Sequence, residues 1–382
     1  MLLSMGNADR TSLASTSDWK WQARHAVTDL AALEKALELT TEERAGAERA
    51  LADGFPLSIT PYYLSLCDPQ DPSCPIRQQC VPVAAEGVPV PGDLRDPLGE
   101  EPHSVAPHLI QRYPDRVLLL ATDRCAVYCR FCTRSRMVGA GGGARPLAEL
   151  QPALDFIRSQ KELKEVILSG GDPLVMSDRR LQALLQELSQ IPHLMYIRVA
   201  SRAPVTLPQR VTPELCQVLR THPSTWLMTH FNHPKELSTE ACQALRLLAD
   251  HGIPTMNQTV LLRGVNDNAA TLEALFRGLL QNRVRPYYLL QTDPVVGTGH
   301  LRTPLSTGLS IMEQLQGRIS GIALPRFIVD TPGGHGKVPV ATNTIVRQGE
   351  GRTTLRTFRG AEIDYIDPPC PRAGLSSDAR MQ

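Results

Sequence analysis

Short hydrophobic runs recur at a regular interval along the second half of the chain. Amphipathic segments lie between them, for example at residues 179–189, 238–251 and 268–281. The β-prone runs begin near Val117, Glu165, Met195, Thr225, Thr255 and Arg285. The last five of these starts are thirty residues apart. Strand, helix and strand at this period are typical of βαβ units, and six units with right-handed crossovers build a parallel sheet.

This pattern predicts the α/β class and, within it, a partial (β/α)6 TIM-like barrel. A doubly wound open sheet is the alternative, because the period does not fix the curvature of a sheet. In a parallel barrel the functional residues lie at the carboxyl ends of the strands. Candidates stand near those ends at residues 125–132, 170–172, 201–202, 230, 258, 293 and 330.

The N-terminal part of the chain carries a helical pattern instead. Residues 19–39 have apolar positions at helical spacing, and Thr40 with Glu43 forms a capping box that opens a second helix. Residues that favour the end of this helix follow: Gly54, Pro56 and Pro61. Residues 67–107 are rich in proline and lack periodicity, which predicts an irregular connection.

These patterns divide the chain into three expected parts. Residues 1–108 form an N-terminal helical and extended segment, and residues 109–331 form the barrel. Residues 332–382 form a C-terminal extension, which begins with a glycine-rich loop around Lys337.

Composition narrows the choice of partners and location. The chain has 382 residues, of which 42% are hydrophobic, so it can fill a large core. The net charge of +1 indicates neither nucleic acid nor an anionic membrane as a partner. No apolar stretch is long enough to span a bilayer, and nine irregularly spaced cysteines suit a reducing compartment, so we expect a cytoplasmic protein.

Cys125, Cys129 and Cys132 follow the first barrel strand, with spacings of four and three residues. One short loop can wrap three thiolates at this spacing around a metal centre, and dense thiolates are the usual ligands of iron–sulfur clusters. Three protein ligands leave one iron of a [4Fe–4S] cluster open to bind another molecule. The alternatives are three incidental buried cysteines or a zinc site, but structural zinc needs four ligands and no second C-x-x-C pair exists.

The cysteine spacing, with Phe131 before the last cysteine, resembles that of the radical S-adenosylmethionine (SAM) enzymes, in which SAM binds the open iron. From about residue 55 to residue 368 the sequence resembles the lysine 2,3-aminomutase family. The matching stretches are residues 112–117, 125–132, 169–173, 201–202, 207–210, 229–234, 260–267 and 330–337.

The resemblance implies a partial barrel, and a [4Fe–4S] cluster, SAM and pyridoxal 5′-phosphate (PLP) as cofactors. It implies an isomerase that interconverts L-lysine and β-lysine by radical 2,3-migration of an amino group. Alternatives with the same chemistry are arginine or ornithine as substrate, or β-lysine supply for modification of elongation factor P. More distant alternatives are a radical SAM enzyme without PLP and a non-enzymatic iron–sulfur or zinc scaffold.

The resemblance also assigns residues to each cofactor. Cys125, Cys129 and Cys132 hold the cluster. The SAM contacts are Gly170, Gly171, Asp172 and Gln258. Lys337 bonds PLP as a Schiff base and is the catalytic lysine, and its glycine loop suits a lysine that reaches inward. The segment that helps to hold PLP contains Arg112, Tyr113 and Arg116, whose arginines suit a phosphate.

For the substrate, the resemblance assigns the α-carboxylate to Arg134 and the distal ammonium to Asp293 and Asp330. Two carboxylates at one site repel each other unless a cation lies between them, so this pair predicts a cationic side chain. The resemblance further implies a homo-oligomer and an electron donor such as flavodoxin or ferredoxin.

The sequence departs from the lysine enzymes of this family in several places. Those enzymes bind a structural zinc through C-terminal cysteines, whereas here only Cys370 lies in the tail and position 268 is Asn268. We therefore expect no structural zinc. Phe131 and Leu290 replace a common histidine and tyrosine. Three further cysteines lie in the irregular segment and are expected to be structural or incidental: Cys67, Cys74 and Cys80.

Overall fold

A ten-stranded sheet forms the centre of the computed structural model, which describes residues 18–52, 57–139, 141–349 and 351–368. Seven neighbouring strands, β3 to β9, run parallel to one another. Their bounds are β3 Arg116–Thr122, β4 Glu165–Gly170, β5 Tyr196–Ala200, β6 Thr225–Thr229, β7 Thr255–Leu261, β8 Arg285–Gln291 and β9 Arg326–Thr331. The six expected starts coincide with β3 to β8 to within one residue, and β9 adds a seventh parallel strand.

The two edges of this sheet come together in space. Antiparallel strands β1 (Ser104–Ala106) and β2 (Leu109–Tyr113) flank β3, and β10 (Gly336–Pro339) flanks β9. Arg112 of β2 lies 2.6 Å from Asp330 of β9, and the backbone N–H of Lys337 in β10 donates to the hydroxyl of Tyr113 at 2.9 Å. A flat sheet would hold β2 and β10 far apart, so the sheet curves into a partial barrel. The barrel prediction is confirmed, and the open sheet is excluded.

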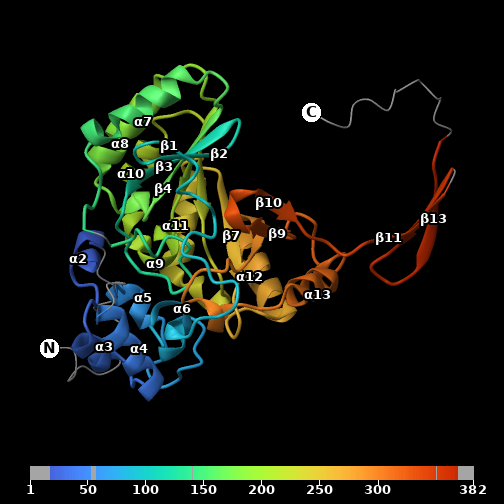
Figure 1. Ribbon diagram of the computed structural model, residues 1–382, viewed down its shortest axis with the longest axis horizontal. Coiled ribbons are helices and arrows are strands. Elements are labelled where there is room, and N and C mark those ends of the chain that lie inside the picture. Colours follow the sequence, from blue (N-terminus) through green and yellow to red (C-terminus); the bar gives the residue numbers. More distant parts are fainter. Residues whose placement is uncertain (1–17, 53–56, 140, 350, 369–382) are drawn as a thin grey trace.

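Helices on the outside of the sheet connect the parallel strands, as Figure 1 shows. They are α7 Leu147–Ser159, α8 Asp178–Ser189, α9 Ala203–Thr206, α10 Pro213–Leu219, α11 Thr239–Asp250, α12 Ala269–Gln281 and α13 Leu305–Leu315. In α8 the buried residues are Leu181, Leu184, Leu185 and Leu188. This spacing of three and four places one apolar face against the sheet, where burial is favourable.

The N-terminal segment is helical, with shorter helices than the sequence indicates. They are α2 Trp19–Arg24, α3 Leu30–Ala36, α4 Thr41–Ala52, α5 Pro61–Ser65 and α6 Arg77–Cys80. The single helical run expected over residues 19–39 is thus split in two. The capping box is present, since Thr40 N–H donates to Glu43 and Glu43 N–H donates to Thr40 Oγ1. Pro61 begins α5 rather than ending a helix, and Gly54 and Pro56 lie outside the described residues.

A buried ion pair joins α4 to the irregular segment. Arg77, which is fully buried, donates from Nε and Nη2 to the two carboxylate oxygens of Glu43, both at 2.6 Å. Three cysteines of this segment, Cys67, Cys74 and Cys80, are also buried, and the sulfur atoms of Cys67 and Cys80 lie 3.9 Å apart. These contacts pack the segment, whose regular elements between residues 67 and 103 are the single turn α6 and a short 3-10 helix at Ala84–Gly87, against the N-terminal helices.

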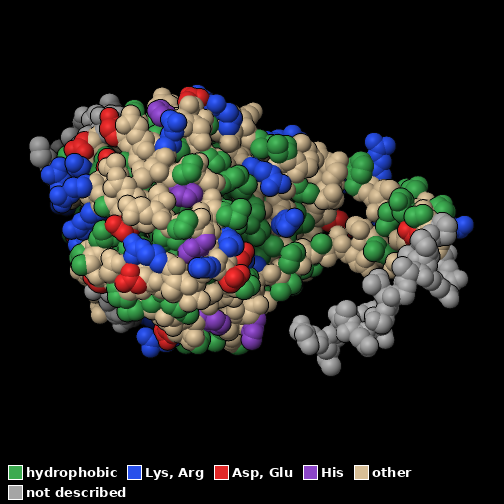
Figure 2. Space-filling model, turned by 90° about the horizontal axis from the view of Figure 1, so that it is seen from above, with side chains coloured by type: hydrophobic (Ala, Val, Ile, Leu, Met, Phe, Trp, Pro, Cys, Tyr) green, Lys and Arg blue, Asp and Glu red, His purple; other side chains and the backbone are tan. Residues whose placement is uncertain are grey.

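An arm projects from the body near the C-terminus. It is an antiparallel sheet of β11 (Ile345–Gly349), β12 (Arg352–Arg356) and β13 (Glu362–Ile366). Figures 1 and 2 show the arm standing away from the barrel, with hydrophobic side chains on its surface. The exposed apolar residues of the arm are Ile345, Val346, Leu355, Phe358, Ile363, Tyr365 and Ile366. Within the described residues, no helix has the length and apolar character needed to cross a membrane.

Candidate functional site

The cysteine loop begins at the carboxyl end of β3 and lies directly against the loop after β4. Gly171 N–H donates to Thr122 O at 2.6 Å, and Asp172 N–H donates to Arg124 O at 2.7 Å. A Cβ on Gly170 would lie 2.1 Å from Thr122 O, and one on Gly171 would lie 2.2 Å from Arg124 O. Backbone packing therefore already requires both glycines, before any contact with a ligand is considered.

The carboxylate of Asp172 is occupied by neighbouring groups. It accepts hydrogen bonds from Ser201 Oγ at 2.6 Å, from Arg202 N–H at 2.8 Å and from Leu174 N–H at 2.9 Å. Burial raises the pKa of Asp172, although these hydrogen bonds oppose the shift. The residue thus ties the loop after β4 to the loop after β5. Its expected contact with the SAM ammonium stays a prediction.

The three cysteine thiols lie close enough to influence one another. Burial raises the pKa of Cys125 well above its usual range and that of Cys132 to about 11, and the neighbouring thiols add to both shifts. Burial also raises the pKa of Cys129, but Arg202 opposes this rise. Arg202 donates from Nη1 to the sulfur of Cys129 at 2.7 Å. A cation at this place favours the thiolate, which is the form that ligates metal.

Arg202 is itself held by a buried polar network. Its Nη2 donates to Glu236 at 2.7 Å and to Gln79 at 2.6 Å, and its Nε donates to the carbonyl oxygen of His230 at 3.1 Å. Glu236 is completely buried. The cation beside the cysteine loop is therefore fixed by residues from the N-terminal segment and from the loop after β6.

The barrel end next to the cysteines offers polar atoms to a ligand. Burial lowers the pKa of His230 to about 3, so its ring is neutral. Its Nε2 and the Oγ1 of Thr229, at the end of β6, are buried and have no hydrogen-bond partner among the residues that the structure describes. Buried polar groups normally find partners, so these atoms fit a polar ligand such as SAM. Gln258, an expected SAM contact, lies on the neighbouring strand β7.

Phe131 of the cysteine loop packs into a small apolar cluster. The other members are Leu262, Val265 and Leu301, all buried. Apolar cover of this kind keeps water away from the neighbouring thiols. Among the described residues, no group of three or more His, Cys, Asp or Glu side chains is arranged to hold a single metal ion.

Lys337 lies in β10, opposite Asp330 of β9 in the strand register. Its Nζ forms an ion pair with Asp330, and its side chain is 30% exposed. The chain contains only six lysines, and Lys20, Lys35, Lys161 and Lys235 are exposed. Lys164 precedes β4 and is therefore at the other end of the strands. Lys337 is thus the one lysine placed at the carboxyl ends of the strands, where it fits the expected bond to PLP.

Two of the three residues expected to help hold PLP meet the Lys337 loop. Arg112 pairs with Asp330 and its Nε donates to Gly334 O at 3.4 Å, while the Tyr113 hydroxyl accepts from Lys337 N–H. Arg116 interacts with other residues. It stacks on the Tyr113 ring, 3.6 Å from the centroid, and pairs with Asp115. A role for Arg116 is therefore indirect in this arrangement.

Asp293 and Asp330 are brought together, as the substrate prediction requires. Burial raises the pKa of Asp293 to about 7, and the negative charge of Asp330 adds to this shift. Lys337 and Arg112 hold the pKa of Asp330 below its usual range, despite its burial. Asp330 is therefore ionised and paired, whereas Asp293 is partly protonated near pH 7, and a further cation beside it would favour its ionised form.

Arg134, expected to bind the substrate carboxylate, already has a carboxylate partner. Its Nε and Nη2 donate to Glu100 at 2.9 and 2.6 Å. Burial opposes the charge of Arg134, but Glu100 more than compensates and the pKa of Arg134 is raised. Glu100 was missed by sequence reasoning, because it lies in the irregular segment where no period or motif marks it. Arg202 was noted only for its place after a strand.

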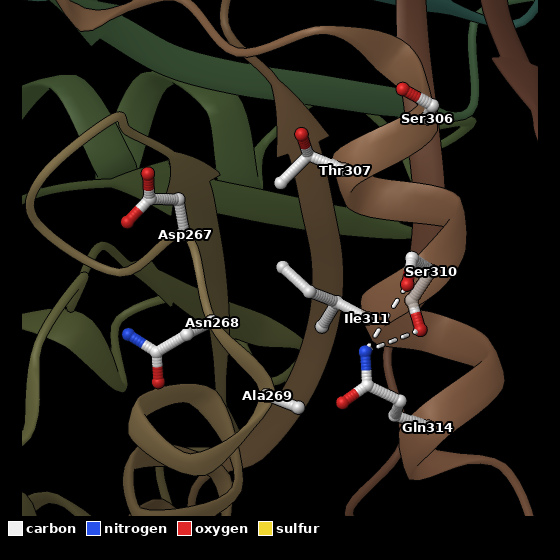
Figure 3. Close-up of a pocket in the computed structure, with 8 residues that line it drawn as sticks. All are labelled: Asp267, Asn268, Ala269, Ser306, Thr307, Ser310, Ile311 and Gln314. Atoms are coloured by element: carbon white, nitrogen blue, oxygen red, sulfur yellow. Dashed lines mark hydrogen bonds between the residues drawn. The ribbon is translucent and has the colours of Figure 1, made fainter.

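Among the described residues, one surface pocket lies apart from this group and another borders it. Figure 3 shows one of about 500 Å³, where the start of α12 meets α13. It contains Asn268, whose side chain caps α12 by accepting from Thr271 N–H at 2.9 Å. The other pocket, of about 490 Å³, reaches Cys132. Cys370 lies outside the described residues, so the expectation about structural zinc stays untested.

Comparison with known proteins identifies the class of this enzyme. Residues 119–275 match the radical SAM superfamily, and this range includes the cysteine loop and most of the parallel strands. The fold and the thiol loop therefore define a radical SAM enzyme, which uses a [4Fe–4S] cluster and SAM.

The chain belongs to the lysine 2,3-aminomutase family, and the C-terminal model of this family matches residues 312–379. It is 46% identical to the L-lysine 2,3-aminomutase of Clostridium subterminale, over 96% of this chain and 88% of that protein. It is 46% identical to the L-lysine 2,3-aminomutase of Fusobacterium nucleatum, over 92% of this chain and 83% of that protein. A glutamate 2,3-aminomutase of Clostridioides difficile is 39% identical, over 92% of this chain and 83% of that protein.

Family membership confirms the expected isomerase and its cofactors, since lysine 2,3-aminomutases depend on PLP in addition to the cluster and SAM. A radical SAM enzyme without PLP and a non-enzymatic scaffold are thereby excluded. The assignment of single residues to each cofactor stays a prediction.

Proposed function

We propose that this protein interconverts L-lysine and β-lysine by radical 2,3-migration of the amino group. The observation that carries the proposal is the pair Asp293 and Asp330 at the barrel mouth, with the raised pKa of Asp293. A distal ammonium between the two carboxylates would let both ionise. The γ-carboxylate of glutamate would add a third negative charge, so the pair favours lysine over glutamate.

The chain's own residues supply the positions for the cofactors. Cys125, Cys129 and Cys132 would hold the cluster, and Lys337 would bond PLP. When bound, the cluster and SAM supply a carbon-centred radical, and PLP supplies a π-system that lets the amino group migrate. The protein orients the substrate between Arg134 and the acid pair, and it limits the access of water to the half-buried thiols.

Arginine and ornithine are the remaining candidates of the same charge. Both carry a distal cation, so the acid pair alone does not exclude them. The distance between the carboxylate site and the ammonium site determines which of the three side chains fits. Supply of β-lysine for modification of elongation factor P is a further use of the same reaction. The proposal also includes a flavodoxin or ferredoxin as electron donor and a cytoplasmic location. It further includes a homo-oligomer, which would cover the apolar side chains of the arm.

Anaerobic incubation of reconstituted protein with SAM, PLP, dithionite and one amino acid at a time tests this function. Lysine, arginine, ornithine and glutamate are compared, with chromatography of the β-amino acid products. We expect β-lysine as the main product. Faster conversion of another amino acid, or no β-lysine, would contradict the proposal.

Substitution of Asp293 and Asp330 tests whether the acid pair binds the distal ammonium of the substrate. Asp293→Asn and Asp330→Asn should each lower kcat/KM for lysine by about tenfold or more, since hydrogen bonds to charged groups contribute about 1.5–3 kcal/mol. Asp250→Asn is the control, because Asp250 is exposed and pairs only with an exposed arginine. Equal activity of all three variants would remove the ammonium contact.

A further inference from the structure

The segment of residues 96–101 joins the two halves of the candidate site. At one side, Glu100 binds Arg134 of the cysteine loop. At the other side, Pro97 O accepts from Gly333 N–H at 3.1 Å in the loop that precedes Lys337. Gly99 packs so closely that a Cβ there would lie 2.7 Å from the Gly333 carbonyl. This segment therefore links the residue expected to bind the substrate carboxylate to the loop expected to bind PLP.

Glu100 uses only one edge of the Arg134 guanidinium. Its carboxylate, which is 3% exposed, accepts from Nη2 at Oε1 (2.6 Å) and from Nε at Oε2 (3.1 Å), and Nε also lies 2.9 Å from Oε1. The Nη1 of Arg134 lies 3.3 Å from Ser169 Oγ. A guanidinium has five N–H donors in one plane, so the edge formed by Nη1 and Nη2 keeps donors for a second carboxylate.

We propose that Glu100 is a positioning residue, which holds Arg134 so that the Nη1–Nη2 edge receives the α-carboxylate of the substrate. This inference rests on the proposed function, which assigns that carboxylate to Arg134. Glu100 fixes the plane of the guanidinium from the side away from the substrate. A bidentate pair is well suited to this, because its two parallel bonds set orientation as well as distance.

The charges around Arg134 explain why an anion is needed at this position. Arg134 lies near enough to Asp293 and Asp330 to interact with both. Without Glu100, the attraction of Arg134 toward these acids would no longer be balanced, and the cation would move toward the place of the substrate ammonium. Glu100 therefore keeps the carboxylate-binding end and the ammonium-binding end of the site apart.

A second arginine holds Glu100 in place. Arg136 lies 3.4 Å from Glu100 and 3.0 Å from Asp96. Glu100 thus contacts two guanidinium groups and does not depend on Arg134 alone for a cation. This arrangement lets Glu100 remain in place when the substrate binds.

Binding measurements without turnover test the proposal. Titration calorimetry of the reconstituted enzyme, loaded with SAM and PLP but without reductant, compares L-lysine with 1,5-diaminopentane, which lacks the carboxylate. Glu100→Gln should weaken lysine binding by about tenfold or more and diamine binding by less than about threefold. In turnover, KM for lysine should rise more than kcat falls.

The matched control is Glu101→Gln, the same change at the next position. The Glu101 side chain is 75% exposed and lies 3.3 Å from Arg136 Nε, so neither ligand should be affected. Glu100→Asp is a second variant, which keeps the charge but is too short to hold both nitrogens in the same plane. It should weaken lysine binding selectively as well, and the iron–sulfur absorbance and the thermal midpoint of each variant report whether it is folded.

Three results would overturn the proposal. Unchanged or tighter lysine binding by Glu100→Gln would mean that Glu100 merely competes with the substrate. Equal weakening of lysine and diamine would indicate a general structural role. A wild-type enzyme that makes β-lysine yet binds both ligands equally would remove the Arg134 contact, whereas failure of the proposed function itself would appear as absence of β-lysine.

Discussion

The raised pKa of Asp293 makes the charge of this buried carboxyl group sensitive to a cationic substrate. Its pKa of about 7 has two causes, burial and the neighbouring charge of Asp330. The sequence places both aspartates at or just after the ends of strands, but neither pKa shift follows from the sequence. The shift depends on the distance between the two side chains and on how much water reaches them, and packing sets both.

We expect lysine binding to become tighter as the pH rises through about 7. Below this pH the folded protein keeps Asp293 protonated, and a neutral carboxyl binds an ammonium weakly. Above it the carboxylate forms. Titration calorimetry from pH 6 to pH 8 measures this rise, and Asp293→Asn should flatten it. A wild-type profile as flat as that of the variant would contradict the assignment.

The same group links pH to stability. The folded-state pKa of Asp293 lies above that of the unfolded chain, so the folded protein holds the extra proton between about pH 4 and pH 7. The contribution of this group to stability is therefore fully present below the unfolded pKa and is lost as the pH rises through about 7. Urea unfolding of Asp293→Asn should show a smaller loss over that interval than the wild type.

Lys337 is the residue that most directly tests the PLP site. Lys337→Ala should abolish the visible absorbance band of enzyme-bound PLP, because no other lysine lies at the carboxyl ends of the strands. Lys235→Ala is the control, since Lys235 is exposed. Persistence of the band in Lys337→Ala would show that another lysine bonds the cofactor.

At the scale of elements, the loops after β3 and β4 are built as one unit. The backbone of Gly170 and Gly171 lies directly against Thr122 and Arg124. The family resemblance assigns the glycine pair to contact with SAM. The structure adds a nearer reason, because two backbones from different strands must pass each other at the base of the cysteine loop.

Gly171→Ala should displace the cysteine loop. The new Cβ would lie 2.2 Å from Arg124 O, a backbone atom that cannot turn away. We expect a loss of about 1–3 kcal/mol in the free energy of unfolding and a lower iron content after reconstitution. Gly321→Ala is the matched control, since its Cβ would meet nothing within 4 Å. Normal iron content in Gly171→Ala would contradict this account.

At the scale of the whole molecule, side chains close the barrel where no strand does. The pair of Arg112 and Asp330 spans the gap between the sheet edges, with side chains 11% and 5% exposed. The strand period predicted the sheet and its parallel order. It did not predict this closure, which joins positions 218 residues apart.

Arg112→Met should loosen the barrel edge, since it leaves a buried carboxylate with one cation fewer. We expect a loss of about 3 kcal/mol in the free energy of unfolding and faster hydrogen exchange in β10. Arg352→Met is the control, because its pair with Asp364 is largely exposed and contributes less than about 1 kcal/mol. Equal effects of the two substitutions would show that the edge pair does not close the barrel.

The sequence by itself determined the strand period, the thiol loop and the identity of the acids and the lysine, because these depend on local spacing and residue type. Tertiary structure decided the curvature of the sheet, the raised pKa of Asp293 and the partners of Arg134 and Cys129. Those properties arise from atoms far apart in the chain: Glu100 and Arg202 act on the cysteine loop only because folding places them beside it and removes the water between them.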